Sequence, residues 1–286
     1  MSDENSENLI EEIESDVPQY YNKTLRLMKI SAGLVTSENQ VKESYRFLNS
    51  NPIWISFPFF ICIIAISQVF IFIILSIKSG TMNNICIVNS QVYFDSYPSL
   101  FLPFTLLHDD FFHLMKTLII LTVFGMPQEI VFGGKVIGSL FIVGLITTTV
   151  FMQAFFPKLA LCGASGGIYT IIFFQLVNWI LNRNEMPYAK FQIRFIGVIM
   201  LYDVAKLFIY IFASGNFVDH MLKYIIDRGN TFIIATLFGY IFVHHNNEKK
   251  RRQMAFIYAF SYFLLFGLAA SFLAVHIKES EVQHFN

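Results

Sequence analysis

Seven long apolar runs restrict the fold of this chain more than any other feature of its sequence. Their approximate limits are residues 53–77, 104–124, 136–156, 159–181, 191–212, 223–243 and 254–275. Each run is close to the ~20 residues that a helix needs to cross a bilayer. The second and sixth also carry ionisable residues. We therefore predict an all-α polytopic membrane protein with seven spans.

The composition supports this prediction. The 286 residues are 55% hydrophobic and 14% charged, and the mean hydropathy is +0.55. A soluble domain of this length would not carry so much apolar surface with so few charges. The formal net charge is zero, so nothing indicates a nucleic-acid partner, and the three cysteines do not make a disulfide framework.

The sequence divides into three parts. Residues 1–52 read as a cytosolic N-terminal region with a disordered acidic start, residues 53–276 as the membrane domain, and residues 277–286 as a short tail. Basic residues gather in the loop between spans four and five (Arg183 and Lys190) and in residues 249–252, between spans six and seven. Because cytosolic loops carry the excess of Lys and Arg, we expect the N-terminus in the cytosol.

Two polar stretches at the starts of spans are candidates for chemistry. The fourth span begins at Gly163-Ala164-Ser165-Gly166-Gly167, where a serine hydroxyl and backbone N–H groups can act on one substrate carbonyl. The second begins at 108–117, where His113 and Thr117 lie one turn apart on one helix face. We expect a functional face at 113–117 and an interfacial helix start at 108–110.

Residues 106–134 and 161–182 resemble the rhomboid family of intramembrane serine proteases, in particular its seven-span eukaryotic secretory-pathway branch. The resemblance is carried by the Gly-x-Ser-Gly element, by His-x4-His at the head of an earlier span, and by Gly125-x3-Glu129-x3-Gly133. It implies a bundle of six core helices plus a seventh. It also implies a catalytic Ser–His dyad in a water-filled cavity open to the outer side of an endomembrane or plasma membrane.

Carried over by position, the resemblance makes Ser165 the nucleophile. Gly163 and the backbone N–H of Ser165 match the oxyanion region, with His113 as a side-chain donor. Tyr169, one turn after Ser165, matches the aromatic residue that packs against the catalytic histidine.

The chain departs from the family pattern at three places. Thr117 stands where the family has an oxyanion asparagine, and residues 97–100 (Tyr-Pro-Ser-Leu) replace a Trp-Arg element. The catalytic histidine position falls on Arg228, or on Phe232 in a shorter register. Neither can act as a base, because guanidinium stays protonated and a phenyl ring has no lone pair.

Other residues could supply a base. Counting residues from the cytosolic ends of the spans puts Asp227 level with Ser165, and His220 about 10 Å higher at 1.5 Å per residue. A partly unwound loop could bring His220 down. A Ser–Lys dyad with Lys116 or Lys223 is a second possibility.

The lysines also have structural interpretations. Lys223 can extend to the outer interface, and Lys116 can pair with an acidic neighbour such as Asp109 or Asp227. Asp203 and Lys206 are spaced to form an i,i+3 ion pair within span five.

Three functions remain open. The first is an intramembrane serine endopeptidase that cuts a transmembrane helix near its outer end. The second is a rhomboid pseudoprotease that binds transmembrane helices of single-span proteins and affects their trafficking or degradation. A transporter, suggested by buried charges, is the third, although no inverted repeat is evident. The sequence has no metal or cofactor motif.

Overall fold

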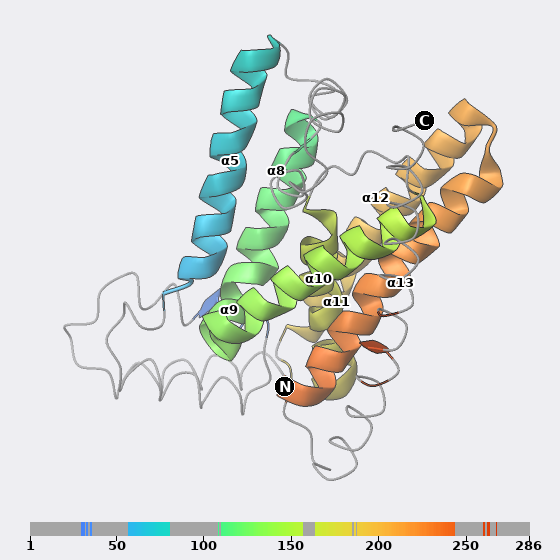
Figure 1. Ribbon diagram of the computed structural model, residues 1–286. Coiled ribbons are helices and arrows are strands. Elements are labelled where there is room, and N and C mark those ends of the chain that lie inside the picture. Colours follow the sequence, from blue (N-terminus) through green and yellow to red (C-terminus); the bar gives the residue numbers. More distant parts are fainter. Residues whose placement is uncertain are drawn as a thin grey trace, which may run out of the picture.

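The computed structural model describes residues 30, 31, 33, 35, 57–80, 108, 110–156, 164–184, 186, 188–243, 260, 262, 263 and 267. Within these ranges the chain is all helical, apart from short turns and caps (Figure 1). Gly163, residues 97–100, the tail, and most of the N-terminal region and of the seventh predicted span lie outside the described residues.

The described helices lie in the same order as the predicted spans, with limits that differ by up to eight residues. They are α5 (Phe59–Ser79), α8 (Phe111–Ile120), the π-helical turn η1 (Leu121–Gly125), α9 (Met126–Phe132), α10 (Gly134–Phe155), α11 (Ser165–Asn182), α12 (Ala189–Ser214) and α13 (Phe217–Phe242). The helix at the second predicted span runs on to Phe132, beyond the predicted 124, and the π-helical turn lies in its middle. Helix α13 begins at Phe217, six residues before the predicted 223. The polar residues in its first turns are helical, whereas the prediction began the span only after them.

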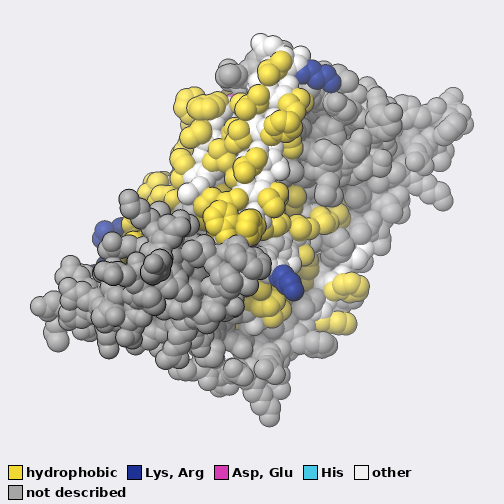
Figure 2. Space-filling model, turned by 90° about the vertical axis from the view of Figure 1, so that its left-hand side faces the viewer, with side chains coloured by type: hydrophobic (Ala, Val, Ile, Leu, Met, Phe, Trp, Pro, Cys, Tyr) yellow, Lys and Arg dark blue, Asp and Glu magenta, His cyan; other side chains and the backbone are white. Residues whose placement is uncertain are grey.

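Among the described residues, four helical stretches are long and apolar enough to cross a membrane: Phe59–Lys78, Phe111–Phe132, Gly134–Phe155 and Ala189–Ala213. Large apolar side chains cover the outer surface of α5 in an almost continuous sheath (Figure 2). Monomeric soluble proteins rarely expose a continuous apolar patch of this size to water. The chain is therefore an integral membrane protein with an all-helical bundle.

Helix α11 is the centre of the bundle and packs chiefly against α13 and α10. Small residues permit these contacts. A Cβ on Gly166 would lie 2.8 Å from the backbone oxygen of Gly144, and a Cβ on Gly239 would lie 2.4 Å from a methyl group of Val177. Backbones that approach this closely gain van der Waals contact, which drives helix association in lipid.

Glu129 ties the second span to the first. Its carboxylate accepts hydrogen bonds from the backbone N–H groups of Phe60 (2.9 Å) and Ile61 (2.8 Å), in the first turn of α5. That turn has no side-chain cap of its own, so Glu129 satisfies donors that would otherwise be orphaned. Gly133, with φ of 85°, then lets the chain turn sharply into α10.

A buried amide cluster fills the end of the bundle away from Ser165. Gln175 donates to the side chain of Gln192 (2.8 Å) and to the backbone carbonyl of Val35 (2.9 Å), which also accepts from Asn178 (2.9 Å). Val35 is itself buried in the main apolar core. A position in the N-terminal region therefore forms part of the membrane domain.

Tyr262, in the seventh predicted span, contacts this bundle at two places, and one of them is a ring contact with Phe151 of α10, with ring centres 6.2 Å apart. The Tyr262 hydroxyl donates to Asn230 on α13 (2.5 Å), and Asn230 donates to Thr148 on α10 (2.7 Å). Tyr262 is buried, so these contacts pack a residue of the seventh predicted span against the core helices.

Candidate active site

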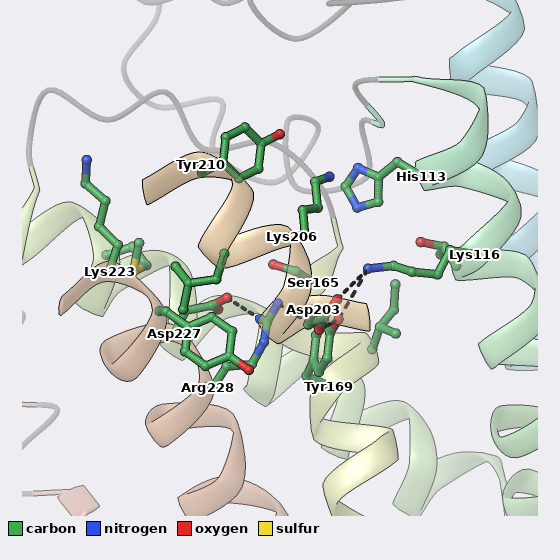
Figure 3. A pocket seen from close by; sticks show the side chains of 15 residues that line it. His113, Lys116, Ser165, Tyr169, Asp203, Lys206, Tyr210, Lys223, Asp227 and Arg228 are labelled. Carbon is green, nitrogen blue, oxygen red and sulfur yellow. Dashed lines mark hydrogen bonds and ion pairs between the residues drawn. The ribbon is translucent and has the colours of Figure 1, made fainter. Parts of the chain in front are cut away.

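A cavity of 280 Å³ lies where α8, α10, α11, α12 and α13 converge. Ser165 lines it together with an unusual number of charged and polar side chains (Figure 3). The lining residues are His113, Lys116, Thr117, Met152, Ser165, Ile168, Tyr169, Asp203, Lys206, Leu207, Tyr210, Lys223, Tyr224, Asp227 and Arg228. Polar groups at membrane depth face a cavity or each other, as they do here.

Ser165 is the first residue of α11 and is half-buried. The preceding Ala164 supplies no side-chain cap, so the first N–H groups of the helix keep their hydrogen-bonding capacity at this end. Among the described residues, no side chain hydrogen-bonds to the Ser165 hydroxyl, although several lie around the same cavity. Within the described part of the chain, the serine thus borders a polar cavity but has no hydrogen-bonded side chain that could take its proton.

Arg228 occupies the place opposite Tyr169. Its guanidinium carbon lies 3.4 Å from the centre of the Tyr169 ring, which is cation–π contact at stacking distance. Phe232, the other candidate for the histidine position, is exposed and packs edge-on against Phe173, with ring centres 5.5 Å apart. Of the two positions, Arg228 is the one that faces Ser165's cavity.

Asp203 on α12 is the hub of an ion-pair network that holds Arg228 in place. It accepts a hydrogen bond from the Tyr169 hydroxyl, and it pairs with Lys116 Nζ at 3.2 Å and with Arg228 at 3.5 Å. Arg228 also pairs with Asp227 on the preceding position of α13. The four helices α8, α11, α12 and α13 are thereby joined through a single buried carboxylate.

The predicted ion pair between Asp203 and Lys206 is wrong for the described structure. The Asp203 carboxylate points to α8 and α13, while the Lys206 ammonium lies 5.7 Å from the ring centre of Tyr210. A pair across helices replaces a pair along one helix, because Lys116 and Arg228 reach the carboxylate from both sides. Lys116 accordingly pairs with Asp203 rather than with the acidic neighbours expected from sequence.

His220 and Lys223, the other candidate bases, lie further along α13 toward its N-terminus. The His220 ring stacks on Tyr210, with centres 6.4 Å apart, and does not line the cavity. Helix α13 is continuous from Phe217, so His220 is eight residues, or about 12 Å along the axis, from Arg228. Lys223 lines the cavity with its ammonium 5.2 Å from the Phe156 ring centre.

His113 and Thr117 line the cavity from α8, and Asp110 caps that helix by accepting from the His113 N–H (2.7 Å). His108, which was expected at an interfacial helix start, lies just before α8 and is buried. It is only 1% exposed, and its Nε2 hydrogen-bonds with the Thr117 hydroxyl at 3.2 Å. The His-x4-His spacing was the available signal, because it sets His108 next to His113, with ring centres 5.1 Å apart.

The chemistry available at this cavity is mainly electrostatic. Lys116 and Arg228 are held by carboxylates, and a protonated guanidinium cannot abstract the serine proton. Within the described parts of the chain, no three His, Cys, Asp or Glu side chains are grouped to hold a metal ion. The arrangement is suited to binding polar or charged groups next to an apolar helix surface.

Comparison with known proteins identifies the scaffold. Residues 97–222 match the family model described as "Rhomboid domain". The chain is 26% identical to Rhomboid-related protein 1 of Caenorhabditis elegans over 274 residues, covering 87% of this chain and 74% of that protein. It is 30% identical to Rhomboid-related protein 2 of Mus musculus over 101 residues, covering 35% of this chain and 33% of that protein. Residues 97–222 therefore form a rhomboid domain, and the chain, with its helical membrane bundle and the serine at the head of α11, is similar to rhomboid-related proteins.

Proposed function

We propose that this rhomboid-family protein binds membrane-spanning helices of other proteins without cleaving them. The observation that carries the proposal is the guanidinium of Arg228, stacked on Tyr169 and paired with Asp203, at the place where the family resemblance calls for a histidine. A serine with no base beside it is a weak nucleophile. The remaining scaffold still offers a polar cavity beside apolar helices.

The route for a client helix lies along α12. This helix exposes large apolar side chains over most of its length, and it meets α8 at the cavity through the Lys116–Asp203 pair. An apolar helix arriving against α12 would place its backbone and polar side chains at Ser165's level. The clients in this proposal are transmembrane helices of single-span proteins, and binding would influence their trafficking or degradation.

The orientation and compartment belong to the same proposal. Basic residues between spans four and five and between spans six and seven support a cytosolic N-terminus. The cavity would then open toward the outer side of an endomembrane or plasma membrane, as the family resemblance implies.

A photo-crosslinking experiment tests binding and cleavage together. The full chain, with benzoylphenylalanine at Tyr210, is co-expressed with a set of single-span proteins that carry a different tag at each end. Position 77 on α5, exposed and remote from the cavity, serves as the control site. We expect adducts from position 210 that retain both tags, at equal levels in the Ser165→Ala variant. Adducts at position 210 no stronger than at position 77 would refute binding.

A second candidate is the serine endopeptidase, and one observation favours it. Ser165 stands at a helix N-terminus beside a polar cavity that also holds Lys116 and His113, and a lysine can act as base in Ser–Lys enzymes. Loss of one tag from the client, restored in Ser165→Ala, would establish this function in place of the first.

A further inference from the structure

The cavity beside Ser165 carries more positive than negative charge. Among its lining residues are four cations, Lys116, Lys206, Lys223 and Arg228, and two carboxylates, Asp203 and Asp227. Both carboxylates already form ion pairs. Asp203 pairs with Lys116 and Arg228, and Asp227 pairs with Arg228. Lys206 takes no part in these ion pairs, so it adds a positive charge that the two lining carboxylates do not balance.

Lys206 is the centre of this excess. Its ammonium makes a ring contact with Tyr210, 5.7 Å from the centroid, and no ion pair with a described residue. In Figure 3 the Lys206 side chain extends between His113 and Ser165, on the cavity side of α12. Two buried donors of cavity-lining residues, Tyr224 Oη and Arg228 Nε, lack an acceptor among the described residues, while one acceptor, Asp227 Oδ1, lacks a donor there.

The N-terminus of α11 adds to the same field. Ser165 opens this 18-residue helix with no side-chain cap, so its first N–H groups and the helix dipole present partial positive charge. The helix dipole, the Lys206 ammonium and the donors without acceptors together favour the binding of an anionic group that can accept hydrogen bonds.

The depth of the cationic side chains along their helices indicates whether the anion comes from a lipid headgroup or from a protein side chain. Lys206 is eight residues before the end of α12 at Ser214, about 12 Å along the helix axis. Lys116 lies five residues inside α8, about 8 Å from its start. Lipid phosphates stay at the bilayer surface, whereas a side chain on a spanning helix reaches this depth. The exposed apolar flank of α12 is also a surface for a helix rather than for a headgroup.

We propose that the cavity accepts an aspartate or glutamate carboxylate carried by the membrane-spanning helix of a client. This inference rests on the proposed function and names the feature by which clients are selected. An acidic residue within a span is costly in lipid, so the excess positive charge of the cavity offers it a partner that the bilayer cannot. Helices with a neutral amide at the same place gain much less.

The test uses the full chain in phosphatidylcholine nanodiscs and a set of apolar single-span peptides. The peptides differ at one position, level with Ser165, which is Asp, Asn, Glu, Gln or Lys, and affinity is measured by fluorescence energy transfer. We expect Asp and Glu peptides to bind at least about tenfold more tightly than their amide counterparts, and the Lys peptide to bind most weakly. Lys206→Gln should reduce the acidic preference to about twofold or less.

Lys190→Gln is the matched control, because Lys190 is exposed on the same helix and outside the cavity. It should leave the acidic preference unchanged. Equal binding of acid and amide peptides would overturn this inference and leave helix binding standing. Failure of every peptide to bind would overturn both.

A final arm measures phosphatidylglycerol bound to the protein in mixed nanodiscs. Lipid enrichment that depends on Lys206, with no acidic preference among the peptides, would assign the cavity to a lipid phosphate instead.

Discussion

The guanidinium carbon of Arg228 lies 3.4 Å from the centre of the Tyr169 ring, while the Tyr169 hydroxyl donates a hydrogen bond to Asp203. The two residues are one structural unit, because Asp203 also pairs with Arg228 at 3.5 Å. An aromatic ring that the family resemblance assigns to packing against a histidine here supports a permanent cation. Under the proposed function, Arg228 replaces a base with a fixed positive charge in the cavity.

Arg228→His should therefore place a titratable imidazole above Tyr169 and raise the reactivity of Ser165. We expect labelling by a fluorophosphonate probe to rise roughly 10²-fold over the parent chain, which is the size of a general-base contribution. Gel fluorescence of the purified protein in detergent measures it. The gain should vanish in the double variant Arg228→His/Ser165→Ala.

Arg228→Lys is the control for loss of the guanidinium alone. It keeps a cation near Asp203 but adds no imidazole, so we expect labelling to stay at the parent level. Labelling of the parent chain itself, lost in Ser165→Ala, would contradict the binding function and favour the endopeptidase.

Asp203→Asn should destabilise the bundle, because it leaves Lys116 and Arg228 without their shared carboxylate. Asp203 is 5% exposed and Lys116 25%, so we expect a loss of about 3 kcal/mol, the lower end for breaking a buried pair. Unfolding in mixed detergent micelles measures the change. Lys135→Gln, at an exposed site, should alter the free energy of unfolding by less than about 0.5 kcal/mol. Equal stability of the two variants would show that the network is dispensable.

The helical bundle could be predicted because its cause is local. The composition of a run such as 136–156 is enough to predict a spanning helix, and the structure has α10 there, at Gly134–Phe155. The small residues of the sixth span were equally informative, since Ala235 is fully buried and Gly239 fits against Val177. These features follow from hydrophobicity and size, which the sequence states directly.

The side-chain partners within the site could not be predicted in the same way. The i,i+3 spacing of Asp203 and Lys206 suggested a pair along α12, but the rotation of that helix turns Asp203 toward α8 and α13. The contact at Val35 was also hidden, because its acceptor is a backbone carbonyl that every residue possesses. Such partners depend on how distant helices are oriented.

Glu129→Ala should weaken the join between the first two spans. The carboxylate accepts from the N–H groups of Phe60 and Ile61, so its loss leaves two donors at the start of α5 without an acceptor. We expect a destabilisation of about 1–2 kcal/mol, the upper range for losing a helix cap. Glu129→Gln keeps one acceptor oxygen and should cost about half as much. Unfolding curves for the two variants provide the comparison, and an Ala variant as stable as the parent would rule out a capping role.

Gly166→Ala should be among the most damaging single-methyl additions in the chain. A Cβ at this position would lie 2.8 Å from both the backbone oxygen of Gly144 and the Cβ of Thr148, so α10 and α11 would have to separate. Overpacking of this kind costs about 1–3 kcal/mol, and it would also shift Ser165, the adjacent residue. Gly197→Ala is the matched control, because Gly197 lies within α12 with nothing within 4 Å of the added Cβ. That variant should be neutral or stabilised by up to about 1 kcal/mol. The difference in unfolding free energy between the two alanine variants measures how closely α10 and α11 approach, and a difference below about 0.5 kcal/mol would mean that the helices can move apart without cost.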